Sequence, residues 1–71
     1  MGIQRRAVVS SVIKSLGYDL KTRFLDIEFQ ETGLYRYFHV PAFVYEDLMR
    51  APSKGHFFDV HIRDVYQYEK L

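Results

Sequence analysis

The clearest periodicity in the chain is an alternation of apolar and polar residues between Phe24 and Gln30. One side of this segment carries Leu25, Ile27 and Phe29, and the other carries Asp26, Glu28 and Gln30. A period of two predicts a β-strand with one buried face and one solvated face. Glu31-Thr32-Gly33 follows at once and predicts a short hairpin connection, because Gly33 stands where a left-handed residue is usually needed.

The next segment, Leu34 to Val40, predicts the partner strand of this hairpin. It is rich in aromatic and β-branched residues, and Pro41 would end its hydrogen-bond ladder. Alternation places Tyr35 and Tyr37 on one face and Arg36 on the other. The tyrosines are therefore either an exposed stacking surface or the layer on which helices pack. We favour the second interpretation, which leaves Arg36 on the opposite face of the sheet.

The region before this hairpin predicts one more strand. Ala7 to Leu16 alternates imperfectly and is dominated by β-branched residues, so we expect a strand with a bulge, although its length also permits a helix. Gly17-Tyr18-Asp19 has the composition of a turn. Residues 1–6 are polar and are expected to be a flexible N-terminus, which leaves residues 7–71 as a single domain.

After Pro41 the apolar period changes from two to nearly four. Val44, Leu48 and Ala51 then share a helical face, with Pro41 at the first helical position and an end before Pro52. Ser53 is the expected N-cap of a second helix. The inner stripe of that second helix is Phe57, Phe58, His61, Ile62 and Val65. The aromatic tail, residues 66–71, is expected to pack back onto the domain.

These elements predict an α+β domain, a three-stranded antiparallel meander followed by two short helices packed on one face. The expected core is Ile13, Leu25, Ile27, Phe29, Tyr35, Tyr37, Val44, Leu48, Phe58 and Ile62. With 71 residues and 48% hydrophobic content, this core has to supply the stability alone, because the absence of cysteine removes disulfides and thiolate zinc sites.

Charge and hydropathy restrict the expected partners. Ten Lys and Arg against nine Asp and Glu give a net charge of +1, which neither demands nor excludes nucleic acid. The N-terminal segment lacks the apolar stretch of a signal peptide, and no apolar run is long enough to span a bilayer. We therefore expect a soluble, cytoplasmic protein with no membrane partner.

Two groups of residues are candidates for binding nucleic acid or another anion. Tyr35 and Tyr37 can stack on bases while Arg36 or Arg23 meets a phosphate, a combination used for single strands. Ser53, Lys54 and Gly55 open the second predicted helix, where free backbone N–H groups attract an anion, and Arg63 can extend that site. The ordinary alternatives are packed tyrosines, a helix start that binds only water, and solvated surface charges.

No residue pattern predicts catalysis. His39, His56 and His61 are spread over different elements, no serine lies in a nucleophile motif, and no glycine loop for phosphates is present. Asp26 and Glu28 share the face expected to be wet, where they keep the sheet edge soluble. We expect no enzyme activity, no cofactor and no metal.

Several segments together resemble the KTSC domain family, named for its occurrence at the C-terminus of some lysyl-tRNA synthetases. The resemblance lies in Ser11 to Asp19, Leu25 to Phe29, Tyr35-Arg36-Tyr37, Val40-Pro41 with Val44, Tyr45 and Leu48, and Ser53 to Asp59 with Ile62-Arg63. Tyr35 and Tyr37 match the central Tyr-x-Tyr of the family. Asp59 departs from the family, where an Asn is expected, and weakens an anion site there.

The chain lacks a synthetase catalytic domain and so is similar to the stand-alone bacterial members. The resemblance implies a small noncatalytic module that binds RNA or another single-stranded nucleic acid. A protein-interaction or structural module, with a protein partner, is the alternative. If RNA binding neutralises about three phosphates, the logarithm of the affinity should fall with the logarithm of salt concentration with a slope near about −2.

Overall fold

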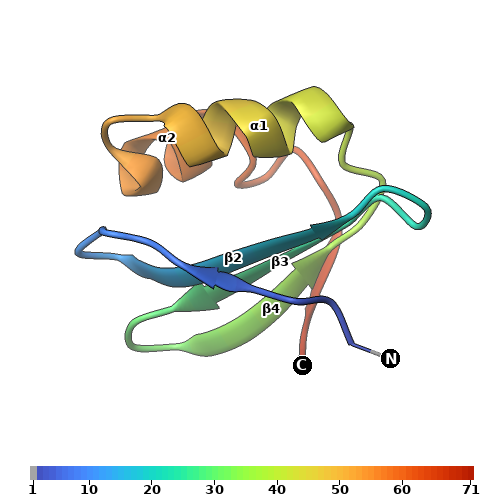
Figure 1. Cartoon of the computed structure of the whole chain (residues 1–71), viewed down its shortest axis with the longest axis horizontal. Coiled ribbons are helices and arrows are strands. Elements are labelled where there is room, and N and C mark those ends of the chain that lie inside the picture. Colours follow the sequence, from blue (N-terminus) through green and yellow to red (C-terminus); the bar gives the residue numbers. More distant parts are fainter. Residues whose placement is uncertain (1) are drawn as a thin grey trace.

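The computed structural model describes residues 2–71 as a five-stranded antiparallel sheet with two helices over one face (Figure 1). The elements in chain order are β1 (Arg6–Ala7), β2 (Ile13–Asp19), β3 (Phe24–Phe29), β4 (Gly33–Tyr37), α1 (Ala42–Arg50), α2 (Lys54–His61) and β5 (Tyr68–Lys70). The strands are ordered β1-β2-β3-β4-β5 across the sheet. The α+β class and the helices on one face are confirmed, but three strands is wrong.

The two additional strands form the edges of the sheet. The segment predicted as one strand from Ala7 to Leu16 is a hairpin, in which the Ser10 hydroxyl accepts hydrogen bonds from the N–H groups of Val12 and Ile13 and reverses the chain. The aromatic tail packs back as predicted, and it does so by adding β5 beside β4. Both edge strands are short, so alternation in the sequence could not reveal them.

Gly17-Tyr18-Asp19 lies inside β2 and is not a turn. Gly17 is needed there because the N-terminal segment crosses the sheet at this point. A Cβ on Gly17 would lie 2.6 Å from the carbonyl oxygen of Gln4. The described part of residues 1–6 therefore includes chain that rests directly on the sheet, while Met1 lies outside the described residues.

The turn after β2 is organised by Asp19. Its Oδ1 accepts a hydrogen bond from the Lys21 N–H, and its Oδ2 accepts one from the Thr22 hydroxyl. Arg23 then adopts a left-handed conformation with φ of 60°. An aspartate that bonds its own downstream backbone is a common turn former, so the turn residue was recognised in the sequence but the turn lies after it.

The β3–β4 hairpin follows the prediction. Gly33 has a φ of 99°, the left-handed conformation that glycine adopts without strain. Leu25 pairs with Tyr37 and Asp26 with Arg36, which fixes the face of each side chain. However, β4 ends at Tyr37, before the predicted end at Val40, because His39 bends the chain with a φ of 58°.

The helices begin and end close to the predicted positions. Pro41 is the N-cap of α1 and not its first residue, and Ala51 ends the helix in extended geometry before Pro52. Ser53 caps α2 as predicted, since its hydroxyl accepts a hydrogen bond from the His56 N–H. The predicted stripe of α2 is too long, because the helix ends at His61 and Val65 is exposed.

The core lies between the helices and the sheet. Most of the predicted core is buried, namely Ile13, Leu25, Ile27, Tyr37, Val44, Leu48, Phe58 and Ile62. Phe29 and Tyr35 are partly exposed and pack against this core, and Leu16 and Val40 are fully buried residues that were not predicted. No helix within residues 2–71 is long and apolar enough to cross a membrane.

Candidate nucleic-acid interface

Five aromatic rings gather on the helix-facing side of the sheet, near the edge formed by β4 and β5. They come from four elements: Phe29 in β3, Tyr35 and Tyr37 in β4, Phe58 in α2 and Tyr68 in β5. Together with Val12, Thr32, Asp59, Arg63 and Asp64 they line an open hollow of about 410 Å³, which we name the aromatic groove.

The rings of the aromatic groove contact one another in a continuous cluster. Phe58 meets Phe29 and Tyr37 edge to face, with ring centroids 5.1 and 5.6 Å apart. Tyr68 lies tilted against Tyr37 at 5.3 Å and against Tyr35 at 5.8 Å. Such offset and edge contacts are the geometries that aromatic pairs prefer, so the rings stabilise one another's positions.

Exposure differs sharply among the tyrosines of the groove. Tyr37 is 5% exposed, which confirms for this residue that the central tyrosines form the layer beneath the helices. Tyr35 is only partly buried, and Tyr68 is 58% exposed. Tyr37 is therefore the floor of the groove, and Tyr68 presents the ring that a ligand can reach.

Burial also affects the pKa of the Tyr37 hydroxyl at the floor of the groove. Desolvation raises the pKa of Tyr37 to about 12, and the neighbouring phenols of Tyr68 and Tyr35 add to the increase while Arg63 opposes it. The Tyr37 hydroxyl therefore keeps its proton at neutral pH and is available as a hydrogen-bond donor.

Charges of both signs surround the rings. Lys70 places its Nζ 5.9 Å from the centre of the Tyr35 ring, a weak cation–π contact. Arg63 Nη1 lies 3.4 Å from Asp59 Oδ1 in an exposed ion pair one helical turn apart. Asp64 adds a second carboxylate. These charged side chains form the edge of the aromatic groove, which we call its rim. The rim therefore has no strong net charge.

Of the residues predicted as binding sites, the structure brings Tyr35, Tyr37 and Arg63 together in the aromatic groove. Arg23 belongs to the β2–β3 turn and does not line the groove. Arg36 points to the opposite face of the sheet, as alternation predicted, but it is already engaged there. Its Nε and Nη2 donate to the two carboxylate oxygens of Asp26 at 2.8 and 2.9 Å.

The Arg36–Asp26 pair corrects the prediction that Asp26 lies on a wet face. Asp26 is 1% exposed, and Arg36 sits directly across from it in the register of β3 and β4. The guanidinium also lies 4.8 Å above the Phe24 ring, and its hydrogen bond to Asp26 raises the pKa of Arg36. A cation held in this way is a structural partner of Asp26 and a poor contact for phosphate.

The second predicted carboxylate of that face, Glu28, is also held by neighbours. The Ser15 hydroxyl donates to Glu28 Oε1 at 2.9 Å and accepts from Arg5 Nε at 3.1 Å. Arg5 comes from the N-terminal segment that crosses the sheet. Hydrogen bonds between polar side chains thus connect neighbouring segments on the face of the sheet away from the helices.

The predicted anion site at the start of α2 is used for packing between elements. Lys54 Nζ donates a hydrogen bond to the carbonyl oxygen of Ala51 at 3.0 Å. This bond provides a partner for a backbone carbonyl at the C-terminal end of α1. Gly55 allows a close approach, since a Cβ there would lie 3.1 Å from a methyl group of Val12. Ser53, Lys54 and Gly55 therefore join α2 to its neighbours, and they lie outside the groove that contains Arg63.

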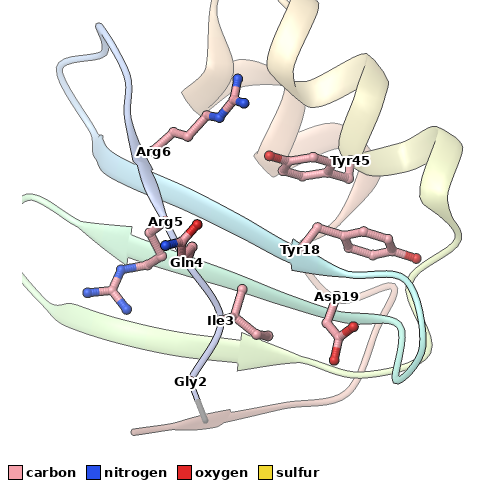
Figure 2. Close-up of a pocket in the computed structure, with 8 residues that line it drawn as sticks. All are labelled: Gly2, Ile3, Gln4, Arg5, Arg6, Tyr18, Asp19 and Tyr45. Carbon is pink, nitrogen blue, oxygen red and sulfur yellow. The ribbon is translucent and has the colours of Figure 1, made fainter.

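A second hollow lies where the N-terminal segment passes the end of β2 (Figure 2). Tyr18 and Tyr45 stack there with ring centroids 5.2 Å apart, and Arg6 extends to the same side of the sheet as Tyr45 while Arg5 extends away. The two rings cover each other, and the Tyr18 hydroxyl donates to the Val40 carbonyl. This hollow therefore offers a ligand less free aromatic surface than the aromatic groove.

Tyr68, Asp64 and Lys70 were not predicted as parts of the site. Tyr66 and Tyr68 alternate with the polar residues Gln67 and Glu69, which is a weak sign of a strand, but nothing in the sequence places that strand beside Tyr35 and Tyr37. The pairing of β5 with β4 creates the groove.

Comparison with known proteins gives a consistent result. A family model described as the KTSC domain matches residues 9–66. A KTSC domain protein from Yersinia pestis has a solved structure with a TM-score of 0.96 and 43% sequence identity, covering 99% of both chains. An uncharacterized protein from Stutzerimonas stutzeri is 40% identical over 97% of this chain and 99% of its own length.

Longer relatives also match. A lysine–tRNA ligase from Nostoc punctiforme is 48% identical over 61 residues, which is 86% of this chain. A lysine–tRNA ligase from a second Nostoc strain is 43% identical over the same length. The chain spans only 11% of the length of either ligase, so the similarity concerns one part of those proteins.

Proposed function

The chain belongs to the KTSC domain family, and from this membership and the aromatic groove we propose that it is a noncatalytic module that binds single-stranded RNA. The observation that carries the proposal is Tyr68, a residue that is 58% exposed although its ring packs against Tyr35 and Tyr37. A large aromatic ring held in place and open to solvent is suited to stacking on a base.

The relatives support RNA as the ligand. A lysine–tRNA ligase acts on an RNA, and a segment of such ligases is 43–48% identical to this chain. RNA-binding domains built on a sheet commonly stack unpaired bases on aromatic side chains. We assign the stacking role to Tyr68 and Tyr35, while Tyr37 forms the floor beneath them.

Electrostatic attraction contributes modestly to this proposed interaction. Lys70 and Arg63 are the cations at the groove, and Asp59 and Asp64 oppose them. If both cations meet phosphates, the logarithm of affinity against the logarithm of salt concentration should have a slope of about −1.4. This is shallower than the value of about −2 expected from three phosphates.

The proposal is tested by fluorescence anisotropy with a labelled, mixed-sequence RNA of about twelve nucleotides at low salt. Tyr68→Ala removes a stacking ring, an interaction worth about 1–3 kcal/mol, so affinity should fall about tenfold. Phe43→Ala is the matched control, because Phe43 is 63% exposed on α1 and does not line the groove. Thermal melting of both variants checks that they remain folded.

Two outcomes would reject RNA binding at this groove. One is the absence of binding by the unmodified protein at low salt. The other is an equal loss of affinity in the Tyr68 and Phe43 variants, which would mean that any exposed aromatic ring contributes. A salt slope near zero, with binding intact, would instead remove the roles of Lys70 and Arg63 in contacting phosphate.

A further inference from the structure

Asp64 is held at the aromatic groove by a tight turn. The chain leaves α2 after His61, and the N–H groups of Val65 and Tyr66 both donate to the carbonyl oxygen of Ile62. Asp64 itself has a φ of 62° inside this turn. The backbone that carries its carboxylate is therefore fixed beside the groove, which it lines together with Tyr37 and Tyr68.

The carboxylate of Asp64 differs from its neighbour Asp59 in being free. Asp59 is paired with Arg63, whereas within residues 2–71 the Asp64 side chain makes no ion pair or hydrogen bond. A free carboxylate next to stacking rings is unfavourable for phosphate, because both groups are negative. It is favourable for a neutral group that donates hydrogen bonds, and such charge-assisted bonds are the stronger ones.

A cationic ligand fits this groove less well than a neutral donor. Lys70 already supplies a cation beside the Tyr35 ring, with its Nζ 5.9 Å from the ring centre, and Arg63 adds a second positive charge that its ion pair with Asp59 offsets only in part. The Tyr37 and Tyr68 rings are inclined to each other by only 32°, so they resemble a stacking surface more than a box around a cation.

We propose that Asp64 makes the groove selective for guanine, an inference that rests on the proposed RNA-binding function. Guanine presents an N1–H and an N2 amino group side by side, which match the two oxygens of one carboxylate. Adenine and cytosine offer an amino group beside an acceptor, and uracil offers only one N–H. The base stacks on Tyr68 while its donor edge meets Asp64, and the protonated Tyr37 hydroxyl is available to the guanine carbonyl oxygen.

The test uses the full chain and labelled uridine heptamers whose central base is guanine, adenine, cytosine or uracil. The guanine heptamer should bind about tenfold more tightly than the others, since a good bidentate contact discriminates by about that factor. A fifth heptamer with central inosine, which lacks the N2 amino group, should lose most of the preference.

Two variants locate the effect. Asp64→Asn keeps the size of the side chain but replaces one acceptor oxygen with a donor, so affinities for the four bases should converge to within about twofold. Asp59→Asn, the matched control on the same rim, should retain the guanine preference. Binding by the Asp64 variant to the uracil heptamer should be unchanged or improved, which a merely unfolded variant would not show.

The outcomes separate this inference from the function on which it rests. Equal binding of all heptamers, or a guanine preference that survives Asp64→Asn, would overturn the inference and leave RNA binding intact. No binding of any heptamer at low salt would overturn both. Shifts in the tyrosine ring resonances on adding a lysine-rich peptide, with none on adding RNA, would assign the groove to a cationic protein partner and also overturn both.

Discussion

Removing Arg36 should destabilise the domain because it would leave Asp26 buried without a partner. In Arg36→Met the two hydrogen bonds of 2.8 and 2.9 Å and the contact above Phe24 disappear, and Asp26, which is 1% exposed in the unmodified protein, loses its partner. Breaking a buried ion pair from one side costs about 3–5 kcal/mol. Since the Arg36 side chain is 24% exposed, water can enter part of the vacated space, and we expect about 2–3 kcal/mol.

The loss is large for a domain of this size, whose free energy of unfolding should be about 4–10 kcal/mol. Urea denaturation followed by circular dichroism measures it directly. With a slope of about 1 kcal/mol per molar urea, the midpoint should fall by about 2–3 M. RNA affinity of the folded variant should stay unchanged, because Arg36 lies on the face away from the groove.

Two controls test the reasoning about the Arg36–Asp26 pair. Arg50→Met breaks an ion pair whose arginine side chain is 74% exposed, and it should cost less than about 0.5 kcal/mol. The double variant Asp26→Leu, Arg36→Met removes both charges and should recover most of the stability lost in the single variant. A loss below about 0.5 kcal/mol in Arg36→Met, or a double variant less stable than the single one, would refute the argument.

Further predictions concern the crossing of the N-terminal segment and the groove floor. Gly17→Ala places a methyl group 2.6 Å from the Gln4 carbonyl oxygen and should cost about 1–3 kcal/mol in thermal or urea melts, whereas Gly2→Ala, with nothing within 4 Å, should be neutral. Equal stabilities of the Gly17→Ala and Gly2→Ala variants in these melts would contradict this. The folded-state pKa of Tyr37 is raised from 10.0 to about 12, so the stability from its neutral phenol is complete below about pH 10 and lost between about pH 10 and 12. Ultraviolet titration should show a tyrosine that ionises near pH 12 and is absent in Tyr37→Phe, and a high-pH titration that Tyr37→Phe leaves unchanged would contradict it.

The candidate site was only partly predictable from the sequence. Alternation placed Tyr35 and Tyr37 on the face opposite to Arg36, and the structure agrees because side-chain period in a strand is fixed by the backbone. Alternation could not show that Arg36 lies opposite Asp26, since the register between two strands depends on the length of their hairpin. Tyr68 joined the site only through the pairing of the tail with β4.

The roles of the glycines show the same limit. Gly33 was predicted correctly as a left-handed turn residue because its role is local. Gly17 and Gly55 were assigned to a turn and to an anion site, but both permit close packing against distant segments, the Gln4 carbonyl and Val12 respectively. A glycine that makes room for another part of the chain has no local signature.

The sequence by itself determined the α+β class, the β3–β4 hairpin, both helices and most of the core, because these follow from periodicity, capping and turn chemistry within short stretches. The tertiary structure alone decided the two edge strands, the burial of Asp26 and the assembly of the aromatic groove. Each of these depends on contacts between residues far apart in the chain, whose register and approach no local pattern specifies.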